Sequence, residues 1–353
     1  MIVKNEQAVL ARCLHSVKGL VDEIIVVDTG STDQTREIAA RYTQKIYDFA
    51  WIDDFSAARN FAFQKAEMEY CIWLDADDVL PADQREGFLT LKDRLSAERP
   101  DVVMMPYEVA FDGKGNPTFR YYRERIVKNH AGFVWEGAVH EVITPSGKIL
   151  YSDVTVRHQK EGEGSPGRNL AIYERLLKQG REFSPREQFY YARELMYNGR
   201  LEEAQQGFLQ FLQQGKGWVE NNIDACRQRA SCLKKLGREL DALRSLFDSF
   251  IYGPPRAETC CDIGAIWMER GSFETAAYWY EQALARPRTD ESGAFVQQDC
   301  YGYLPSIQLC VCYDRLGQHE KARDLNELAA SFKPDDPAVL LNRRYFEELF
   351  PNK

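Results

Sequence analysis

The sequence predicts two domains, an α/β domain followed by an all-α array of helical repeats. Residues 1 to about 160 alternate short apolar runs with segments in which apolar side chains recur at helical spacing. From about residue 169 onward the pattern is helical throughout, and glycines recur between the amphipathic segments. We therefore expect an α/β domain over 1–165 and a helical-repeat domain over 166–353.

Composition narrows the class of protein. The chain has 353 residues, 44% of them hydrophobic, which is enough for two domains of ordinary size. The net charge of -9 argues against nucleic-acid binding, which needs a basic face. No apolar run approaches transmembrane length and no export signal opens the chain, so we expect a cytoplasmic protein without a membrane span. The nine cysteines include no C-x-x-C pair and are expected to be reduced core residues.

The first strands and helix lie near the start of the chain. Residues 1–3 resemble the end of a strand, and apolar side chains over 9–17 fall at helical spacing. Residues 23–27 form a near-continuous β-branched run, as expected for a parallel strand covered on both faces. This run ends at Asp28, and α/β sheets bind ligands at the carboxyl ends of their strands.

Two helices with polar caps are expected next. Ser31 or Thr32 is placed to cap a helix running to about Tyr42. Ser56 is placed to cap a second helix over 57–67.

A short apolar run over 70–74 leads directly into Asp75, Asp77 and Asp78. The run has the length of a buried strand, so the three acids should lie where that strand leaves the sheet. Carboxylates this close repel one another unless a cation lies between them. Oxygen ligands suit Mg²⁺ or Mn²⁺, which can then hold a diphosphate. The alternative is a solvated acidic turn, because short motifs recur by accident.

The remaining α/β elements follow in order. A helix should start at Pro81, and residues 102–109 are expected to form a strand. A cluster of turn residues occupies 112–117. The last strand is expected over 154–158, before a polar, glycine-rich loop or linker at 161–167.

Four turn glycines recur between amphipathic helices, and each is followed five residues later by an alanine. The pairs are Gly199–Ala204, Gly237–Ala242, Gly271–Ala276 and Gly317–Ala322. They match the tetratricopeptide pattern, in which small residues let paired helices approach closely. The uneven spacing of the glycines predicts an insertion near 287–301. A plain helical bundle is the alternative, but pairs in phase favour stacked helical hairpins.

Several motifs together resemble family 2 glycosyltransferases, which have the nucleotide-sugar-binding GT-A fold. The motifs are Met1–Glu6, Asp28–Asp33, Ala58–Asn60 and Leu74–Asp78. The Val139–Glu141 segment, the strand-end His158 and the trailing repeats resemble the bacterial branch with a C-terminal tetratricopeptide region. That branch includes the peptide S-glycosyltransferases that modify glycocin bacteriocins. The family usually has several residues before the position of Met1, so the first strand is expected to be short here.

The resemblance implies roles for the donor-site residues. Asp28 would accept a hydrogen bond from uracil, and Arg59 would contact the base or the diphosphate. Asp77 would bind the metal directly, with His158 as a second ligand. The residues expected to contact the UDP-sugar are Val3, Asn5, Asp28, Arg59, Asp75 and Ala76.

Each of these roles has a structural alternative. Asp28 would instead cap a helix, and Arg59 would be a surface arginine. By the same resemblance, the role of Asp78 itself would be to orient the acceptor or the turn. His158 would be a strand-end histidine that makes one hydrogen bond.

The resemblance also places the catalytic groups. An inverting transfer needs a carboxylate on the acceptor side, and Glu141 is the candidate base. His140 would orient Glu141 or touch the diphosphate. The alternative is that Glu141 pairs with a nearby arginine in a partly buried segment.

The resemblance implies a metal-dependent, inverting glycosyltransferase with Mn²⁺ or Mg²⁺ as cofactor. It would move a hexose or N-acetylhexosamine from a UDP-sugar to an acceptor, and we expect a peptide or protein side chain. One alternative is a cell-envelope polysaccharide or glycolipid acceptor, although the sequence has no membrane helix or basic amphipathic stretch. Another is a non-catalytic tetratricopeptide scaffold. The repeats would hold the acceptor or form a homodimer.

Overall fold

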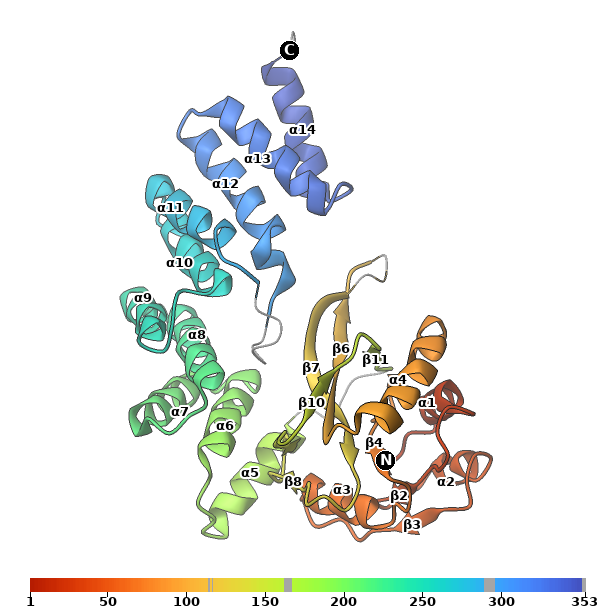
Figure 1. Ribbon diagram of the computed structural model, residues 1–353. Helices are drawn as coiled ribbons and strands as arrows, with labels where there is room; N and C mark the ends of the chain where they lie inside the picture. Colours follow the sequence, from red (N-terminus) through yellow and green to blue (C-terminus); the bar gives the residue numbers. More distant parts are fainter. Residues whose placement is uncertain (114, 116, 162–166, 289–295, 351–353) are drawn as a thin grey trace. The chain divides into compact units, whose positions relative to one another are not determined.

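The computed structural model describes residues 1–113, 115, 117–161, 167–288 and 296–350. The chain divides into two compact units, Met1–Glu182 and Phe183–Lys353 (Figure 1). Helix α5 (Arg168–Lys178) follows the expected domain boundary at 165 and belongs to the first unit.

The smaller sheet of the first unit is entirely parallel. It contains β1 (Ile2–Val3), β2 (Val26–Asp28) and β3 (Ile46–Asp48), in the order β1-β2-β3. The strand expected over 23–27 is shorter at its start and continues to Asp28. In this sheet, β1 ends at Val3 and β2 ends at Asp28, so both residues lie at its carboxyl edge.

The larger sheet is mixed and has the order β4-β7-β6-β11-β5, with β10 also pairing with β6. Its two long strands, β6 and β7, form the curved hairpin seen in Figure 1. Short strands β8 and β9 pair with each other separately. The strands are β4 (Tyr70–Ile72), β5 (Asp78–Val79), β6 (Val102–Phe111), β7 (Pro117–Lys128), β8 (Trp135–Glu136), β9 (Val142–Ile143), β10 (Ile149–Tyr151) and β11 (Val156–His158).

Four helices and a 3-10 turn separate these strands. They are α1 (Leu10–Val17), α2 (Thr35–Ala39), α3 (Phe55–Gln64), η1 (Ala82–Gln84) and α4 (Arg85–Glu98). Phe88, Leu91 and Leu95 of α4 pack in one core with Val103 and Met105 of β6. These α4 residues recur at helical spacing, so α4 buries one stripe against the sheet.

The first expected helix cap is wrong. Helix α2 begins only at Thr35 and has no side-chain cap, because the polar groups before it are used elsewhere. The Ser31 hydroxyl oxygen accepts from the backbone N–H of Asn5, and the backbone N–H of Thr32 donates to the side chain of Asn5. These bonds hold an extended loop where a helix was expected.

The second expected cap is also wrong. Asp54, not Ser56, caps α3, and its carboxylate accepts a hydrogen bond from the N–H of Ala57 at 2.9 Å. Ser56 lies inside the helix, and its hydroxyl donates to the same carboxylate. An aspartate is as good a cap as a serine, so the helix starts earlier than expected.

The second unit is a series of antiparallel helical hairpins, as its pattern of small residues predicts. Each turn glycine has a positive φ between 73° and 76°, and each following alanine is fully buried. The helices are α6 (Pro185–Tyr197), α7 (Leu201–Gln214), α8 (Val219–Lys235), α9 (Glu239–Asp248), η2 (Ser249–Ile251), α10 (Ala257–Glu269), α11 (Phe273–Leu284), η4 (Gln298–Tyr301), α12 (Tyr303–Arg315), α13 (His319–Phe332) and α14 (Pro337–Leu349). Within the insertion expected near 287–301, residues 289–295 lie outside the described residues, and η4 occupies 298–301.

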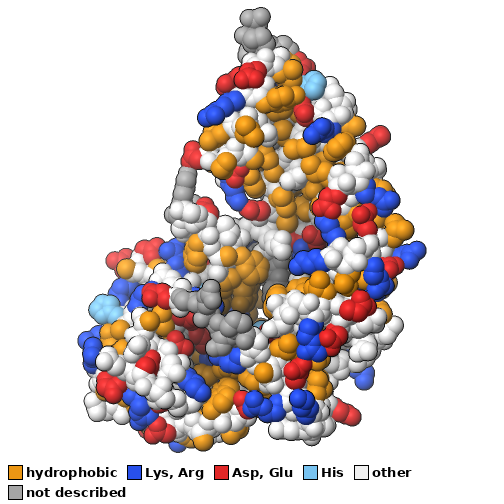
Figure 2. Space-filling model, turned by 180° about the vertical axis from the view of Figure 1, so that it is seen from behind, with side chains coloured by type: hydrophobic (Ala, Val, Ile, Leu, Met, Phe, Trp, Pro, Cys, Tyr) orange, Lys and Arg blue, Asp and Glu red, His pale blue; other side chains and the backbone are white. Residues whose placement is uncertain are grey.

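Two further expectations concern the whole chain. All nine cysteines are buried and free, which confirms that they are core residues. Among the described helices, none has the length and hydropathy of a transmembrane span. On the face drawn in Figure 2, hydrophobic side chains gather over the C-terminal helices of the second unit.

Candidate active site

Pairing between β5 and β11 builds the centre of the site. The two strands run antiparallel, with Asp78 directly opposite His158. The backbone N–H of Gln159 donates to the carbonyl of Asp77 at 2.8 Å, which extends the pairing by one residue. Two segments far apart in sequence thus place both expected metal ligands side by side.

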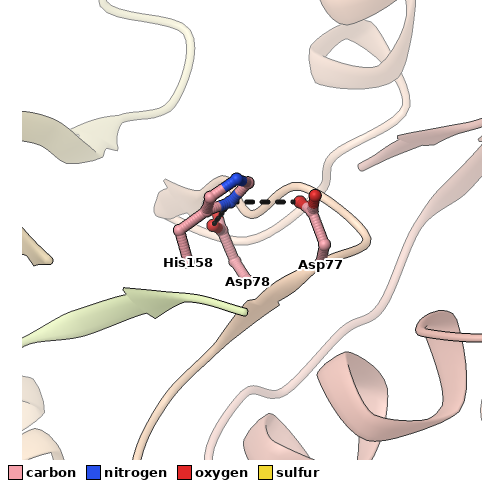
Figure 3. A group of neighbouring side chains, drawn as sticks. All are labelled: Asp77, Asp78 and His158. Atoms are coloured by element: carbon pink, nitrogen blue, oxygen red, sulfur yellow. Dashed lines mark ion pairs between the residues drawn. The ribbon is translucent and has the colours of Figure 1, made fainter. Parts of the chain in front are cut away.

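Asp77, Asp78 and His158 form one cluster of potential ligand atoms (Figure 3). The Nδ1 atom of His158 lies 3.4 Å from Asp77 Oδ1 and 3.6 Å from Asp78 Oδ1. This nitrogen is buried and makes no hydrogen bond of normal geometry with any described residue. A buried ring nitrogen facing two carboxylates fits a divalent cation, and a mixed oxygen and nitrogen set suits Mn²⁺.

The charge on the imidazole depends on the same carboxylates. The nearby carboxylate of Asp77, and then that of Asp78, raises the pKa of His158 to about 10, although burial opposes the shift. An imidazolium therefore balances the carboxylates when no metal is bound. A cation held by Asp77 and His158 would replace that proton, because a metal ligand must be deprotonated.

Asp78 has a mainly structural role. Its carboxylate accepts hydrogen bonds from the Tyr107 hydroxyl at 2.8 Å, Arg125 Nη1 at 2.8 Å and the N–H of Asp75 at 3.0 Å. Burial opposes ionisation, but Arg125 and these donors outweigh it and hold the pKa of Asp78 below its usual range. In return the N–H of Asp78 donates to the carbonyl of Asp75 at 3.0 Å, so Asp78 orients the turn.

Arg125 lies between two aromatic rings, and its side chain is fully buried. Its guanidinium carbon is 3.9 Å from the ring centre of Trp73 and 4.2 Å from that of Tyr107. The Trp73 indole N–H in turn donates to the carbonyl of Glu124 at 2.6 Å. A desolvated guanidinium gains from stacking on aromatic faces, so these rings support the Asp78 ion pair.

Arg59 connects the acidic turn to the candidate base. Its Nη2 donates to Asp75 Oδ1 and its Nε donates to Glu141 Oε1, both at 2.6 Å. The guanidinium also lies over the rings of Trp73 and Trp135. Arg59 is only 8% exposed, so the alternative of a surface arginine is wrong.

Glu141 forms an ion pair with Arg59, as the alternative to its role as base predicts. Its side chain is 12% exposed, and Arg59 orients one carboxylate oxygen. The preceding residue, His140, has a φ of 52°, which is uncommon for a residue other than glycine. Such a backbone is held only when its surroundings determine it, and it fixes the direction in which Glu141 leaves the chain. The base role of Glu141 stays a prediction.

The residues expected to contact the nucleotide lie in a loop that is held together by hydrogen bonds. Val3 lies opposite Asp28 in the β1–β2 register. Asp28 Oδ1 accepts from the Ser31 N–H at 3.0 Å and from its hydroxyl at 2.6 Å. Asn5 Oδ1 accepts from the N–H of Thr32 at 2.8 Å. Asp28 is buried and shapes this turn rather than capping a helix, while its contact with uracil stays a prediction.

Ala76 belongs to the core of the smaller sheet. It is 6% exposed and packs in one cluster with Val3, Val26 and Leu10. Its neighbours Asp75 and Asp77 are both partly exposed, so the chain alternates between core and site across this turn.

Comparison with known proteins identifies this domain. Residues 1–155 match the profile of the family described as Glycosyl transferase family 2. The first unit carries a family 2 glycosyltransferase domain. The chain is similar to glycosyltransferase SunS of Bacillus subtilis, with 29% identity over 213 residues, 58% of this chain and 50% of that protein.

Two further relatives carry different names. A TPR repeat-containing protein of Synechococcus elongatus is 36% identical over 147 residues, 41% of this chain and 35% of that protein. The lipopolysaccharide core biosynthesis glycosyltransferase LpsC of Rhizobium meliloti is 25% identical over 189 residues, 51% of this chain and 66% of that protein. The chain therefore spans half or less of the length of SunS and the Synechococcus protein.

Sequence reasoning missed two charged residues of the family 2 domain. Burial, then Asp77 and Asp75, raise the pKa of Glu6 to about 7, so Glu6 is a further carboxylate near the acidic turn. Its place in the first motif was the available signal. The sequence gives no signal for Arg125, because the alternation of Arg123 and Arg125 is what any strand with one polar face shows.

We predict that Asp77→Asn lowers the pKa of His158 in the metal-free protein, because it removes the largest cause of the shift. Nitrogen-detected NMR of the imidazoles measures this pKa directly. A raised pKa stabilises the metal-free fold fully below about pH 6.5, and that stability is lost as pH rises through about 10. His319, which pairs with Asp314, is the internal control. An unchanged titration of His158 would contradict the pairing.

Proposed function

We propose that the protein is a metal-dependent, inverting glycosyltransferase that uses a UDP-sugar. The observation that carries this proposal is the Asp77–His158 pair, with its unbonded ring nitrogen, inside a family 2 domain. Asp28 ends β2 and Asp75 follows β4, and α/β folds bind ligands at the carboxyl ends of their strands.

Asp77 and His158 would hold the cation, and Mn²⁺ fits their donor atoms better than Mg²⁺ does. A bound divalent cation supplies charge stabilisation for the departing diphosphate. Asp78 would keep the turn in place through Arg125, and Asp75 would face the ribose while Arg59 holds it.

Glu141 would take the acceptor proton. Arg59 binds one of its oxygens and so leaves the other as the acceptor of that proton. An acceptor thiol would need less help, because a thiolate is itself a strong nucleophile. His140 would set the orientation of this carboxylate through its constrained backbone.

We predict that Asp77→Asn lowers Mn²⁺-dependent UDP-sugar turnover by roughly 100-fold, the effect of losing one charge-stabilising group. The fold should survive, because the Asp77 side chain is 24% exposed. A coupled assay of UDP release with and without Mn²⁺ measures the change. Asp83→Asn, at an exposed position on η1, is the matched control. Normal turnover in Asp77→Asn would exclude the metal role, and no hydrolysis or transfer by the wild type would favour the scaffold alternative.

We predict that Glu141→Gln lowers transfer to a hydroxyl acceptor by roughly 100-fold or more, as loss of a general base does. UDP affinity, measured by calorimetry, should change little, because a base acts mainly in the transition state. Glu136→Gln, at an exposed position of β8, is the control. If UDP affinity falls as far as turnover, Glu141 instead serves as the structural partner of Arg59.

A peptide or protein acceptor is supported by the helical repeats. Helices α8 and α10 border a small polar hollow with three carboxylates and two guanidiniums. Its lining residues are Glu220, Ile223, Asp224, Arg227, Arg256, Glu258 and Tyr301. Such a polar hollow suits the N–H groups and basic side chains of a polypeptide, and repeat arrays offer extended binding surfaces.

Asp224 is the lining carboxylate with the longest hydrogen bonds, and Arg227 Nη1 lies 3.9 Å from its Oδ1 atom. Gln228 donates to it at 3.2 Å and 3.4 Å, whereas Tyr301 holds Glu258 at 2.9 Å and Arg256 holds Glu220 at 2.6 Å. Asp224 therefore keeps more accepting capacity for a bound chain.

We predict that Asp224→Asn raises the KM for a basic peptide acceptor about fivefold, the effect of weakening one charged hydrogen bond. UDP-sugar hydrolysis without acceptor should not change. Asp324→Asn, at an exposed position on α13, is the control. An unchanged KM would remove the hollow from the acceptor site.

A saccharide acceptor is the second candidate, favoured by the similarity to LpsC, whose name gives a role in lipopolysaccharide core biosynthesis. Transfer to an oligosaccharide but not to any peptide would support it.

A further inference from the structure

Helix α1 contacts both of the segments that build the candidate metal site. Cys13 on its buried face packs in one core with Val156 of β11. The Cys13 thiol also donates to the carbonyl of Asp75 at 3.3 Å. One turn later, the Ser16 hydroxyl oxygen accepts from the N–H of Leu80 at 3.1 Å. The position of α1 therefore affects the acidic turn and the last strand of the sheet together.

The chain directly after β11 is exposed and has few bonds of its own. Residues 159–161 are all exposed. The backbone N–H of Gln159 donates to the carbonyl of Asp77 at 2.8 Å, one residue beyond the paired part of the strands. Exposed ends of strands fray unless other groups hold them. His158 lies one residue before this end, so fraying would carry its imidazole away from Asp77.

Arg12 on α1 holds this strand end. Its Nη2 donates to the carbonyl of Gln159, and its Nη1 donates to Glu161 Oε1. The forked guanidinium thus joins a backbone group and a side chain that lie two residues apart. No other side chain of the described residues bonds to Gln159 or Glu161. Gln159 is therefore bonded through its N–H to the acidic turn and through its carbonyl to α1.

The bonds of Arg12 bear on the site more than on the stability of the fold. The side chains of Arg12 and Glu161 are 34% and 53% exposed, and an ion pair that solvent reaches contributes little to stability. The bond to the Gln159 carbonyl instead fixes the backbone beside His158. Loss of Arg12 should therefore leave the domain folded and change the geometry of one strand end.

We propose that Arg12 is a positioning residue of the metal site, which holds the chain after His158 against α1 and so keeps the imidazole beside Asp77 (Figure 3). The inference rests on the proposed function, because it takes Asp77 and His158 as the residues that hold the cation. Groups that orient metal ligands without touching the metal typically change metal affinity by about 10–100-fold when they are removed. Arg12 would act in this way through the backbone of Gln159.

Calorimetry of UDP binding to the full chain, in Mn²⁺ and in EDTA, tests this role. The ratio of the two affinities measures what the metal contributes, because metal and nucleotide binding are linked. We expect Arg12→Gln to lower the ratio about tenfold, as loss of an orienting group does, and to leave UDP affinity in EDTA unchanged. Arg94→Gln, which breaks an exposed ion pair with Glu98 on α4, is the matched control and should keep the wild-type ratio.

The outcomes separate this inference from the proposed function. An unchanged ratio in Arg12→Gln, beside a large ratio in the wild type, would overturn the inference alone. A wild-type ratio near one would overturn the metal role and the inference with it.

Hydrogen exchange of the metal-free protein tests the same contact without a ligand. We expect the N–H of Gln159 to exchange about tenfold faster in Arg12→Gln, the effect of losing one charged hydrogen bond. The N–H of Val27 in β2 should keep its rate. Equal rates at Gln159 in both proteins would show that Arg12 does not hold the strand end. If Arg12→Gln does not fold, Arg12→Lys, which keeps the charge without the fork, should shift both measurements in the same direction.

Discussion

The buried ion pair between Asp78 and Arg125 is the interaction on which the site depends. Both side chains are fully buried, and their atoms are 2.8 Å apart. Removing one partner of such a pair typically costs about 3–5 kcal/mol, because the other charge is left uncompensated. The pair joins β5 to β7, while Tyr107 joins the same carboxylate to β6. The acidic turn is therefore held by the central strands of the sheet.

The other acids of the site differ in how fully their charge is compensated. Asp78 forms an ion pair with Arg125, while Asp75 and Glu141 both form ion pairs with Arg59. Asp77, among the ion pairs of the described residues, has only the imidazole of His158. Glu6, with its raised pKa, adds negative potential nearby. Asp77 is therefore the carboxylate whose charge is best placed to attract a cation. The residues that hold the turn are thus distinct from the one that would bind the metal.

Sequence reasoning recovered the features that local pattern determines. The glycine–alanine pairs of the repeats, the strand end at Asp28 and the strand that precedes Asp75 follow from spacing and apolar runs. It failed where distant residues compete for the same polar group. Ser31 is a good helix cap in isolation, but its hydroxyl oxygen accepts from the N–H of Asn5, 26 residues away. The burial of Arg59 likewise depends on Asp75 and Glu141, which no local pattern connects.

The pairing of β5 with β11 has a consequence for biosynthesis. During translation, Asp77 leaves the ribosome long before His158, and β11 is the last strand of its sheet. Contacts between distant residues form late, because the intervening chain must first be ordered. A cation held by both residues would therefore bind only the completed domain. Metal binding would then also act as a check on folding, since it stabilises the native state and no earlier intermediate.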